Sequence, residues 1–319
     1  MNPTNENLPG LKEIEAASKR ISGVASRTPL VESPALSRLT GHEVYLKLEC
    51  FQPIKVFKIR GAYNKISLLS QSGVVAASSG NHGIAVAYSS RLLSKKCTVV
   101  VPETAVREKV DTIAEYGAEV VTAGRYSIER EAKARKIAEA TGAAFVHPFN
   151  DPDVIAGQGT CGLEIAHQLS DIDAVLVPVG GGGLISGVST ALKAIRPETR
   201  VYGVEPQGAP KLAEALKAKK VVTIPSPASI ADGLIPSALG GLTYEACSRN
   251  VDGTFTVSEE DIIRATRTMI KEARIFAEPS AAAPLAPLLS PSGVIGRRVV
   301  LVVSGGNLSH ELLAKLLSP

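Results

Sequence analysis

Short runs of β-branched, apolar residues alternate with longer helix-like segments along this chain, and this alternation limits the possible folds more than any other feature. The apolar runs are residues 97–101, 119–121, 174–177, 201–204 and 299–303. Most of them are continuously apolar, which is typical of strands buried on both faces. Helix-like segments of ten or more residues lie at 83–93, 106–116, 127–141 and 184–195. The pattern predicts an α/β fold with largely parallel sheets.

Composition narrows the function classes. The 319-residue chain is 45% hydrophobic, which suffices for one large or two modest buried cores. Its 35 basic and 31 acidic residues form no extended basic run, so we expect no nucleic-acid partner. The four cysteines lie far apart, which predicts neither a zinc site nor a disulfide framework. Because no apolar stretch could span a bilayer or form a signal peptide, we expect a cytoplasmic protein without a membrane partner.

Three predicted strands run directly into glycine-rich turns. The strand at 74–79 leads into Gly80-Asn81-His82-Gly83, the strand at 174–179 into four consecutive glycines at 180–183, and the strand at 299–303 into Ser304-Gly305-Gly306-Asn307. In open α/β sheets, ligands bind beyond the carboxyl ends of the strands. The three turns therefore predict one composite site.

The four consecutive glycines are a candidate phosphate-binding loop. Backbone N–H groups without neighbouring Cβ atoms can surround a phosphate, helped by the N-terminus of the helix that begins near Leu184. A flexible turn is the alternative, but four glycines lose much conformational entropy on folding. The register fits neither a dinucleotide-binding fingerprint nor a Walker A loop. We therefore expect the phosphate of a group smaller than a dinucleotide.

Lys58 is a candidate reactive amine. It lies between Phe57 and Ile59, next to Arg60, at the start of a helix that runs towards Leu69. Apolar neighbours and a nearby cation both lower the pKa of an amine, as a lysine that forms a Schiff base requires. Taken alone this signal is weak, because a lone lysine is normally a surface residue.

Five motifs, in this order along the chain, resemble those of the fold-type-II pyridoxal-phosphate (PLP) enzymes, and specifically the serine/threonine dehydratase and serine racemase branch. The motifs are Phe57-Lys58-Ile59-Arg60-Gly61-Ala62, Ser78-Ser79-Gly80-Asn81-His82-Gly83, Ala156-Gly157-Gln158-Gly159-Thr160, the four-glycine loop and Ser304-Gly305-Gly306-Asn307. The resemblance implies two open, twisted, mostly parallel sheets with flanking helices, as in tryptophan synthase β. It also implies a large PLP-binding domain at 1–52 and 149–319, and a small mobile domain at 53–148.

The resemblance further implies which residues hold the cofactor. Lys58 would carry PLP as a Schiff base and later take the α-proton of the substrate. Asn81 would hydrogen-bond the ring oxygen, and Ser304 would face the pyridine nitrogen. The implied cofactor-binding residues are Phe57, Lys58, Asn81, Gly180, Gly181, Gly182, Gly183, Gly233, Glu278 and Ser304.

Other residues are implied for the substrate. Four residues at a strand end and the following helix N-terminus would present donors to its carboxylate: Ser78, Ser79, Asn81 and His82. Arg130 would lie near the substrate side chain, as in racemase-like members, or would be a solvated helix residue. Ser79 stands where racemases of the family carry a hydroxyl opposite the lysine, and it would then be a second catalytic acid–base group.

The activity implied is dehydration of L-threonine and L-serine to 2-oxobutanoate or pyruvate, with release of ammonia. A neutral serine hydroxyl at the pyridine nitrogen makes PLP a weaker electron sink, which favours expulsion of a β-leaving group. A serine racemase, a 3-hydroxyaspartate dehydratase and a β-replacing PLP enzyme stay open as alternatives. From another class, a non-catalytic phosphate-binding protein would use only the glycine loop. We expect a small amino-acid substrate and a homo-oligomer, either a dimer or a tetramer.

The chain also departs from the family pattern. Metal-dependent members bind a divalent cation through the equivalents of Glu205 and Ala209 and an Asp, but here Lys211 replaces the Asp, so we expect no metal, with the ammonium filling the site. The loop before Phe57 reads Ile54-Lys55-Val56 in place of the usual Thr-Gly-Ser, which leaves the substrate open. The last predicted helix is followed only by two residues, whereas isoleucine-regulated members carry a further domain, so we expect a catabolic or unregulated enzyme.

Overall fold

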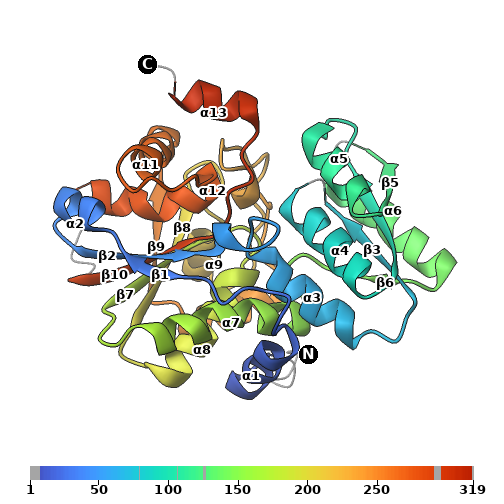
Figure 1. The fold of residues 1–319 in the computed structure, drawn as a ribbon, viewed down its shortest axis with the longest axis horizontal. Helices are drawn as coiled ribbons and strands as arrows, with labels where there is room; N and C mark the ends of the chain where they lie inside the picture. The colour runs from blue at the N-terminus through green and yellow to red at the C-terminus, as the bar shows by residue number, and fades with distance from the viewer. Residues whose placement is uncertain (1–7, 79, 106, 125–126, 291–295, 318–319) are drawn as a thin grey trace.

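Two separate sheets organise the protein, for which a computed structural model describes residues 8–78, 80–105, 107–124, 127–290 and 296–317. One sheet has six strands in the order β1-β2-β10-β7-β8-β9, and the other has four in the order β5-β4-β3-β6. Within these sheets every strand pair is parallel except β1 with β2. The predicted α/β fold with two mostly parallel sheets is confirmed (Figure 1).

The apolar runs of the sequence coincide with β3, β4, β5, β7, β8 and β10. The larger sheet contains β1 (Leu30–Glu32), β2 (Glu43–Leu48), β7 (Ala174–Pro178), β8 (Arg200–Pro206), β9 (Gly253–Val257) and β10 (Arg298–Val303). The smaller sheet contains β3 (Gly73–Ala77), β4 (Lys96–Val101), β5 (Glu119–Thr122) and β6 (Ala144–Phe145). Strand β7 is buried along its whole length, as expected for a continuous apolar run.

Helices cover both faces of the larger sheet (Figure 1). One face packs against α2 (Pro34–Thr40), α11 (Glu259–Lys271), α12 (Pro279–Ala282) and the 3-10 segment η3 (Ala283–Leu289). The other face packs against α7 (Pro152–Gln168), α8 (Gly183–Ile195), α9 (Lys211–Ala218) and α10 (Gly241–Asn250). Strand β10 contributes Leu301 to the first core and Val300 and Val302 to the second, because successive side chains of a strand point to opposite faces.

Helix α3 (Lys58–Leu68) lies between the two sheets (Figure 1). It packs with α4 (Asn81–Leu92) and α5 (Arg107–Glu115) in the core of the smaller sheet, and it also contacts α7. Helix α6 (Ser127–Thr141) covers the other face of that sheet. The strands of the smaller sheet fall within 73–145, inside the small domain expected at 53–148, whose boundaries stay a prediction. The remaining elements are α1 (Leu11–Arg20), η1 (Glu49–Phe51), η2 (Asp232–Leu234) and α13 (His310–Leu317).

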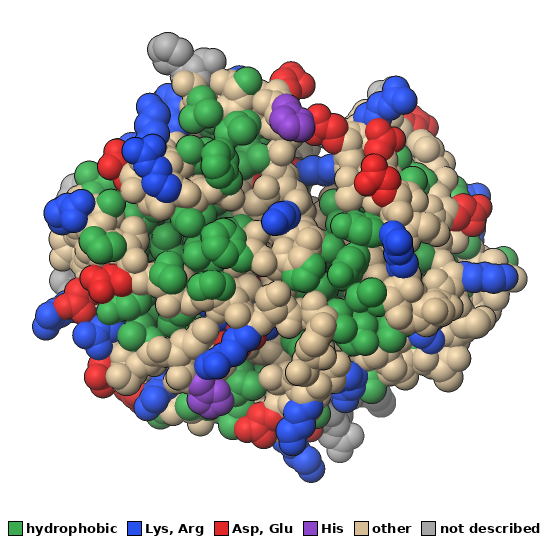
Figure 2. All heavy atoms as spheres, in the orientation of Figure 1, with side chains coloured by type: hydrophobic (Ala, Val, Ile, Leu, Met, Phe, Trp, Pro, Cys, Tyr) green, Lys and Arg blue, Asp and Glu red, His purple; other side chains and the backbone are tan. Residues whose placement is uncertain are grey.

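The elements packed around the smaller sheet and those packed around the larger sheet form two groups. Helix α5, in the smaller group, contacts the larger group through charged side chains. Lys109 forms an ion pair with Asp232 at 2.5 Å, and Glu108 lies 3.6 Å from the ring of His310. Figure 2 shows the surface hollowed near the top of the view between the two groups, with charged side chains around it. Within the described part of the chain, no helix is both long enough and apolar enough to cross a membrane.

Candidate active site

Lys58 is the first residue of α3, and its amine lies against backbone oxygen. Its Nζ donates a hydrogen bond to the carbonyl oxygen of Pro148 at 2.8 Å and lies 5.3 Å from the centre of the Phe57 ring. Burial lowers the pKa of the Lys58 amine to about 8. The expected contribution of Arg60 to this pKa was wrong, because the Arg60 charge is compensated by Glu49 and Glu164. A larger neutral fraction of the amine suits attack on an aldehyde.

The turn after β10 is fastened to the loop before Lys58. The backbone N–H of Phe57 donates to the carbonyl oxygen of Ser304 at 3.0 Å, and the N–H of Gly306 donates to that of Lys55 at 2.8 Å. Val56 and Gly305 form an antiparallel bridge between these hydrogen bonds. Two of the sequence motifs therefore meet at the carboxyl end of the larger sheet. Lys55 adopts a φ of 61° there, a left-handed conformation that favours glycine.

Asn81 and Glu278 join a third motif to the same place. The Nδ2 of Asn81 donates to Glu278 Oε1 at 2.8 Å, and the Nδ2 of Asn307 donates to Asn81 Oδ1 at 2.8 Å. The N–H of Glu278 donates to the carbonyl oxygen of Gly305 at 3.1 Å. Burial raises the pKa of Glu278 to about 7, and the nearby charge of Asp232 acts in the same direction. These hydrogen bonds join the N-terminus of α4, beside the smaller sheet, to the turn after β10 of the larger sheet.

The four-glycine loop packs where side chains would not fit. A Cβ on Gly181 would lie 2.1 Å from the ring of Phe149, and a Cβ on Gly180 would lie 2.5 Å from the carbonyl oxygen of Gly233. Gly182 has a φ of 90°, and α8 begins at Gly183. The loop therefore presents backbone and a helix N-terminus, which suits an anion. Because Phe149 follows Pro148 directly, the loop lies beside the backbone that accepts the Lys58 hydrogen bond.

Sequence analysis did not identify the segment His147-Pro148-Phe149-Asn150 as part of the site. His147 Nδ1 accepts hydrogen bonds from the N–H groups of Phe149 and Asn150 at 3.2 and 2.8 Å, so this nitrogen is unprotonated. Burial lowers the pKa of His147 to about 4. Asn150 Oδ1 accepts from the N–H of Leu242 at 2.9 Å. The signal that could have indicated this segment is a polar turn between an apolar strand and the Asp-Pro start of α7.

Three of the residues expected to bind the substrate carboxylate, Ser78, Asn81 and His82, lie at or just before the N-terminus of α4. The N–H of Gly80 donates to Ser78 Oγ at 3.3 Å. His82 is buried, with Nε2 3.0 Å from the carbonyl oxygen of Val146, and burial lowers the pKa of His82 to about 3. Its ring is therefore neutral and offers no positive charge to a carboxylate. The backbone N–H groups at the N-terminus of α4 are the donors that could bind one. Ser79 lies outside the described residues.

Two further predicted residues lie at different distances from this set. The N–H of Gly233 donates to Ser280 Oγ at 3.0 Å, and its carbonyl oxygen faces Gly180, so Gly233 adjoins the glycine loop. Arg130 lies on α6, which packs against the smaller sheet, away from the elements that carry Lys58 and the glycine loop. Its contact with a substrate side chain stays a prediction.

The ammonium of Lys211 lies beside Glu205 and Ala209, whose equivalents bind a divalent cation in metal-dependent members of the family. It lies 3.1 Å from Glu205 Oε1 and donates to the carbonyl oxygens of Ala209 and Leu234 at 2.8 and 3.0 Å. Glu205 also accepts from the N–H groups of Leu212 and Ala213. Burial lowers the pKa of Lys211, and the Glu205 carboxylate opposes this effect. A fixed side-chain cation thus satisfies the carboxylate here.

Together these residues fit a small cofactor that carries a phosphate and an aldehyde. The glycine loop presents backbone and leads into a helix N-terminus, which suits a phosphate, and a partly neutral lysine amine lies beside it. Phe57 and Asn81 supply an aromatic face and an amide from neighbouring elements. Fold and site together fit the class of enzymes that use a phosphorylated aldehyde as cofactor.

Comparison with known proteins identifies the family. The family model described as pyridoxal-phosphate dependent enzyme matches residues 21–305, and the chain belongs to this family, with pyridoxal 5'-phosphate as its cofactor. The L-threonine ammonia-lyase of Thermotoga maritima is 41% identical over 97% of this chain and 78% of that protein. The beta-hydroxyaspartate dehydratase of Paracoccus denitrificans is 39% identical over 96% of this chain and 98% of that protein. The structure of maize serine racemase superposes with a TM-score of 0.92 at 37% identity, covering 96% of each chain.

Proposed function

We propose that this chain is a dehydratase that converts L-threonine and L-serine to 2-oxobutanoate and pyruvate with release of ammonia. The observation that carries the proposal is the Lys58 amine, whose pKa is lowered to about 8 and which lies on the backbone beside the four-glycine loop. Similarity to an L-threonine ammonia-lyase along nearly the whole chain supports the same reaction.

The residues of the chain divide the work as follows. When bound, PLP supplies an electron sink for the α-carbon of an amino acid. We assign covalent attachment of PLP and transfer of the α-proton to Lys58, because its lowered pKa leaves part of the amine neutral near pH 8. The four-glycine loop and the N-terminus of α8 would bind the phosphate. The N-terminus of α4, which begins at Asn81, would orient the substrate carboxylate.

Ser304 is the residue that favours elimination. Its side chain is uncharged and buried, and we assign it to the ring nitrogen. A serine hydroxyl does not hold a proton on that nitrogen as a carboxylate does. Departure of a β-hydroxyl is then favoured over other outcomes at the α-carbon.

Two assays test this function. Borohydride reduction of the holoprotein should label Lys58, and label on another lysine would contradict the assignment. A keto-acid assay across L-threonine, L-serine, D-serine and threo-3-hydroxyaspartate should show release from the first two. Preference for threo-3-hydroxyaspartate would support a role of Arg130 in binding a second carboxylate, whereas D-serine formation in excess of keto acid would indicate a racemase that uses Ser79. We also propose that the enzyme is a homo-oligomer, which light scattering would measure.

A further inference from the structure

Arg60 faces away from the amine of Lys58 although the two residues are only two positions apart on α3. Each residue of a helix turns the chain by about 100°, so the two side chains differ in direction by about 200°. Lys58 reaches the carbonyl of Pro148, whereas Arg60 is fully buried on the opposite side of the helix. Ile59, between them, packs into the core of the smaller sheet. The first turn of α3 is therefore held by three different contacts.

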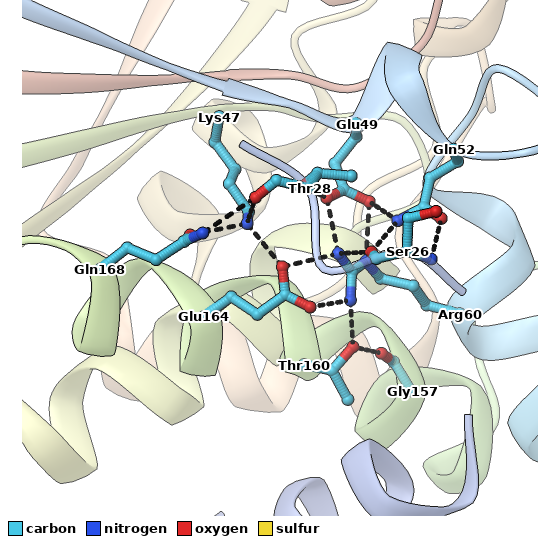
Figure 3. A network of polar contacts seen from close by, with 10 residues as sticks. All are labelled: Ser26, Thr28, Lys47, Glu49, Gln52, Arg60, Gly157, Thr160, Glu164 and Gln168. Atoms are coloured by element: carbon cyan, nitrogen blue, oxygen red, sulfur yellow. Dashed lines mark hydrogen bonds and ion pairs between the residues drawn. The ribbon is translucent and has the colours of Figure 1, made fainter. Parts of the chain in front are cut away.

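The guanidinium of Arg60 clamps two carboxylates at once (Figure 3). Its Nε and Nη2 donate to the two oxygens of Glu49 at 2.7 and 2.8 Å, and its Nη1 and Nη2 donate to those of Glu164 at 2.7 and 2.9 Å. Nη1 also donates to Thr160 Oγ1 at 3.0 Å, and Nη2 to the carbonyl oxygen of Ser26 at 3.1 Å. Because the guanidinium is planar and rigid, these hydrogen bonds fix its direction as well as its position.

Lys47 balances the charge of this cluster, which is shown in Figure 3. Its Nζ lies 2.5 Å from Glu164 Oε2 and donates to the carbonyl oxygen of Thr28 and to Gln168 Oε1, each at 2.8 Å. Two cations therefore meet two carboxylates. Burial opposes ionisation of Glu49, but the charge and hydrogen bonds of Arg60 outweigh it and lower the pKa of the carboxyl group. Glu49 and Arg60 therefore stay ionised as a pair.

Close packing of α3 on α7 acts at the same turn. A Cβ on Gly61 would lie 2.7 Å from the carbonyl oxygen of Val154, and a Cβ on Gly157 would lie 2.6 Å from the Cα of Gly61. The two helices therefore meet through their backbones directly beside Arg60. Backbone contact at these two glycines leaves little room for sliding, and the buried side chain of Gln158 fills the space beside Gly61.

Net stability alone does not account for a buried ion cluster, because well-packed apolar side chains stabilise a protein as well or better. We propose that Arg60 is a positioning residue, which holds the Lys58 amine at the four-glycine loop by clamping the opposite side of α3 to α7 and η1. This inference rests on the proposed role of Lys58. Through the clamp, the first turn of α3 is fixed to α7 and η1, which lie beside the larger sheet.

A pair of variants tests the clamp. Arg60→Lys keeps the positive charge and removes the planar, multiply bonding guanidinium. Lys47→Met removes the other cation of the cluster, a buried residue that lies on β2 and not on α3. We expect Arg60→Lys to lower kcat by about 10- to 100-fold with little change in KM, since a misplacement of about 1 Å has effects of this size. It should also slow the uptake of PLP by the apoprotein, followed as borohydride-trapped label at Lys58, and speed hydrogen exchange in the first turns of α3. Lys47→Met should lower Tm while leaving kcat and the labelling rate within about threefold of wild type.

The outcomes separate the two proposals. Label on another lysine in the wild-type protein overturns the proposed function itself. If Lys58 is labelled, the clamp is overturned when Arg60→Lys keeps the kcat, labelling rate and exchange rates of the wild type. It is also overturned when Arg60→Lys and Lys47→Met lose kcat equally. Should Arg60→Lys fail to fold, Thr160→Val removes a single acceptor of the guanidinium without a change of charge. A severalfold loss of kcat and labelling rate at unchanged Tm would then support the clamp, and a wild-type rate would overturn it.

Discussion

Replacing Lys58 with methionine should stabilise the cofactor-free protein while abolishing covalent binding of PLP. At pH 7 most of the Lys58 amine is protonated, although burial disfavours the charge and lowers its pKa to about 8. Methionine has a similar length and no charge to bury. The residue that makes the site reactive is thus expected to weaken the fold around it.

The magnitude follows from the pKa. A fall from the ordinary value of 10.5 to about 8 corresponds to about 3 kcal/mol against folding, at about 1.4 kcal/mol per pH unit. Some solvent contact of Lys58 reduces this figure, and the hydrogen bond to Pro148, worth about 1 kcal/mol, would be lost. We therefore expect a net gain of about 1 to 2 kcal/mol in the free energy of unfolding at pH 7.

The pH dependence of unfolding provides a second test of whether the Lys58 charge destabilises the folded protein. Below about pH 8 the amine is protonated in both the folded and the unfolded protein, so the full cost of burying the charge is present. Between about pH 8 and 10.5 the folded protein loses its proton first, and the stability of the wild type rises relative to the variant. Urea unfolding of both apoproteins at pH 7 and above pH 10 measures this, with the exposed Lys217→Met as control. A Lys58→Met protein that is less stable at pH 7, or a difference that does not change with pH, would refute the reasoning.

Three further substitutions are expected to have defined effects. Gly181→Ala places a methyl carbon 2.1 Å from the Phe149 ring, so the loop must shift and PLP affinity should fall at least tenfold, about 1.4 kcal/mol, in a fluorescence titration; unchanged affinity would count against the phosphate assignment. Lys55→Gly relieves a left-handed φ of 61° and should raise the free energy of unfolding by about 0.5 to 1 kcal/mol in urea, whereas a loss would show that the conformation is unstrained. Lys211→Met leaves the buried Glu205 carboxylate without its ion partner and should destabilise the protein by about 3 kcal/mol, measured by urea unfolding; a loss below about 1 kcal/mol would mean that the backbone donors to Glu205 suffice.

Local sequence patterns predicted much of the fold, and their failures have physical causes. Strands β7 and β10 are continuously apolar and buried, so they were evident. Strand β2 includes Lys47, which is buried because Glu164 pairs with it from α7, and a lysine does not indicate a central strand by itself. Strand β6 has only two residues, and β9 is half exposed, so neither leaves a strong pattern.

Local sequence patterns also indicated some features of the site and missed others. Glycine-rich turns after apolar strands indicated a phosphate loop and a composite site, and the structure brings the turns at Ser304 and Asn81 together through Glu278 and Asn307. The hydrogen bond from Lys58 to Pro148 joins residues 90 positions apart, and no local pattern could indicate it.

The sequence by itself determined the alternation of strands and helices and the glycine-rich turns that follow the apolar strands, because these patterns depend on a residue and its near neighbours. Tertiary structure decided which charges are compensated. Arg60 was expected to act on the Lys58 amine, yet folding places it between Glu49 and Glu164, and the low pKa of Lys58 comes from burial instead. The strength of a charge–charge interaction depends on distance and on exclusion of water, and both are set only when distant segments of the chain pack together.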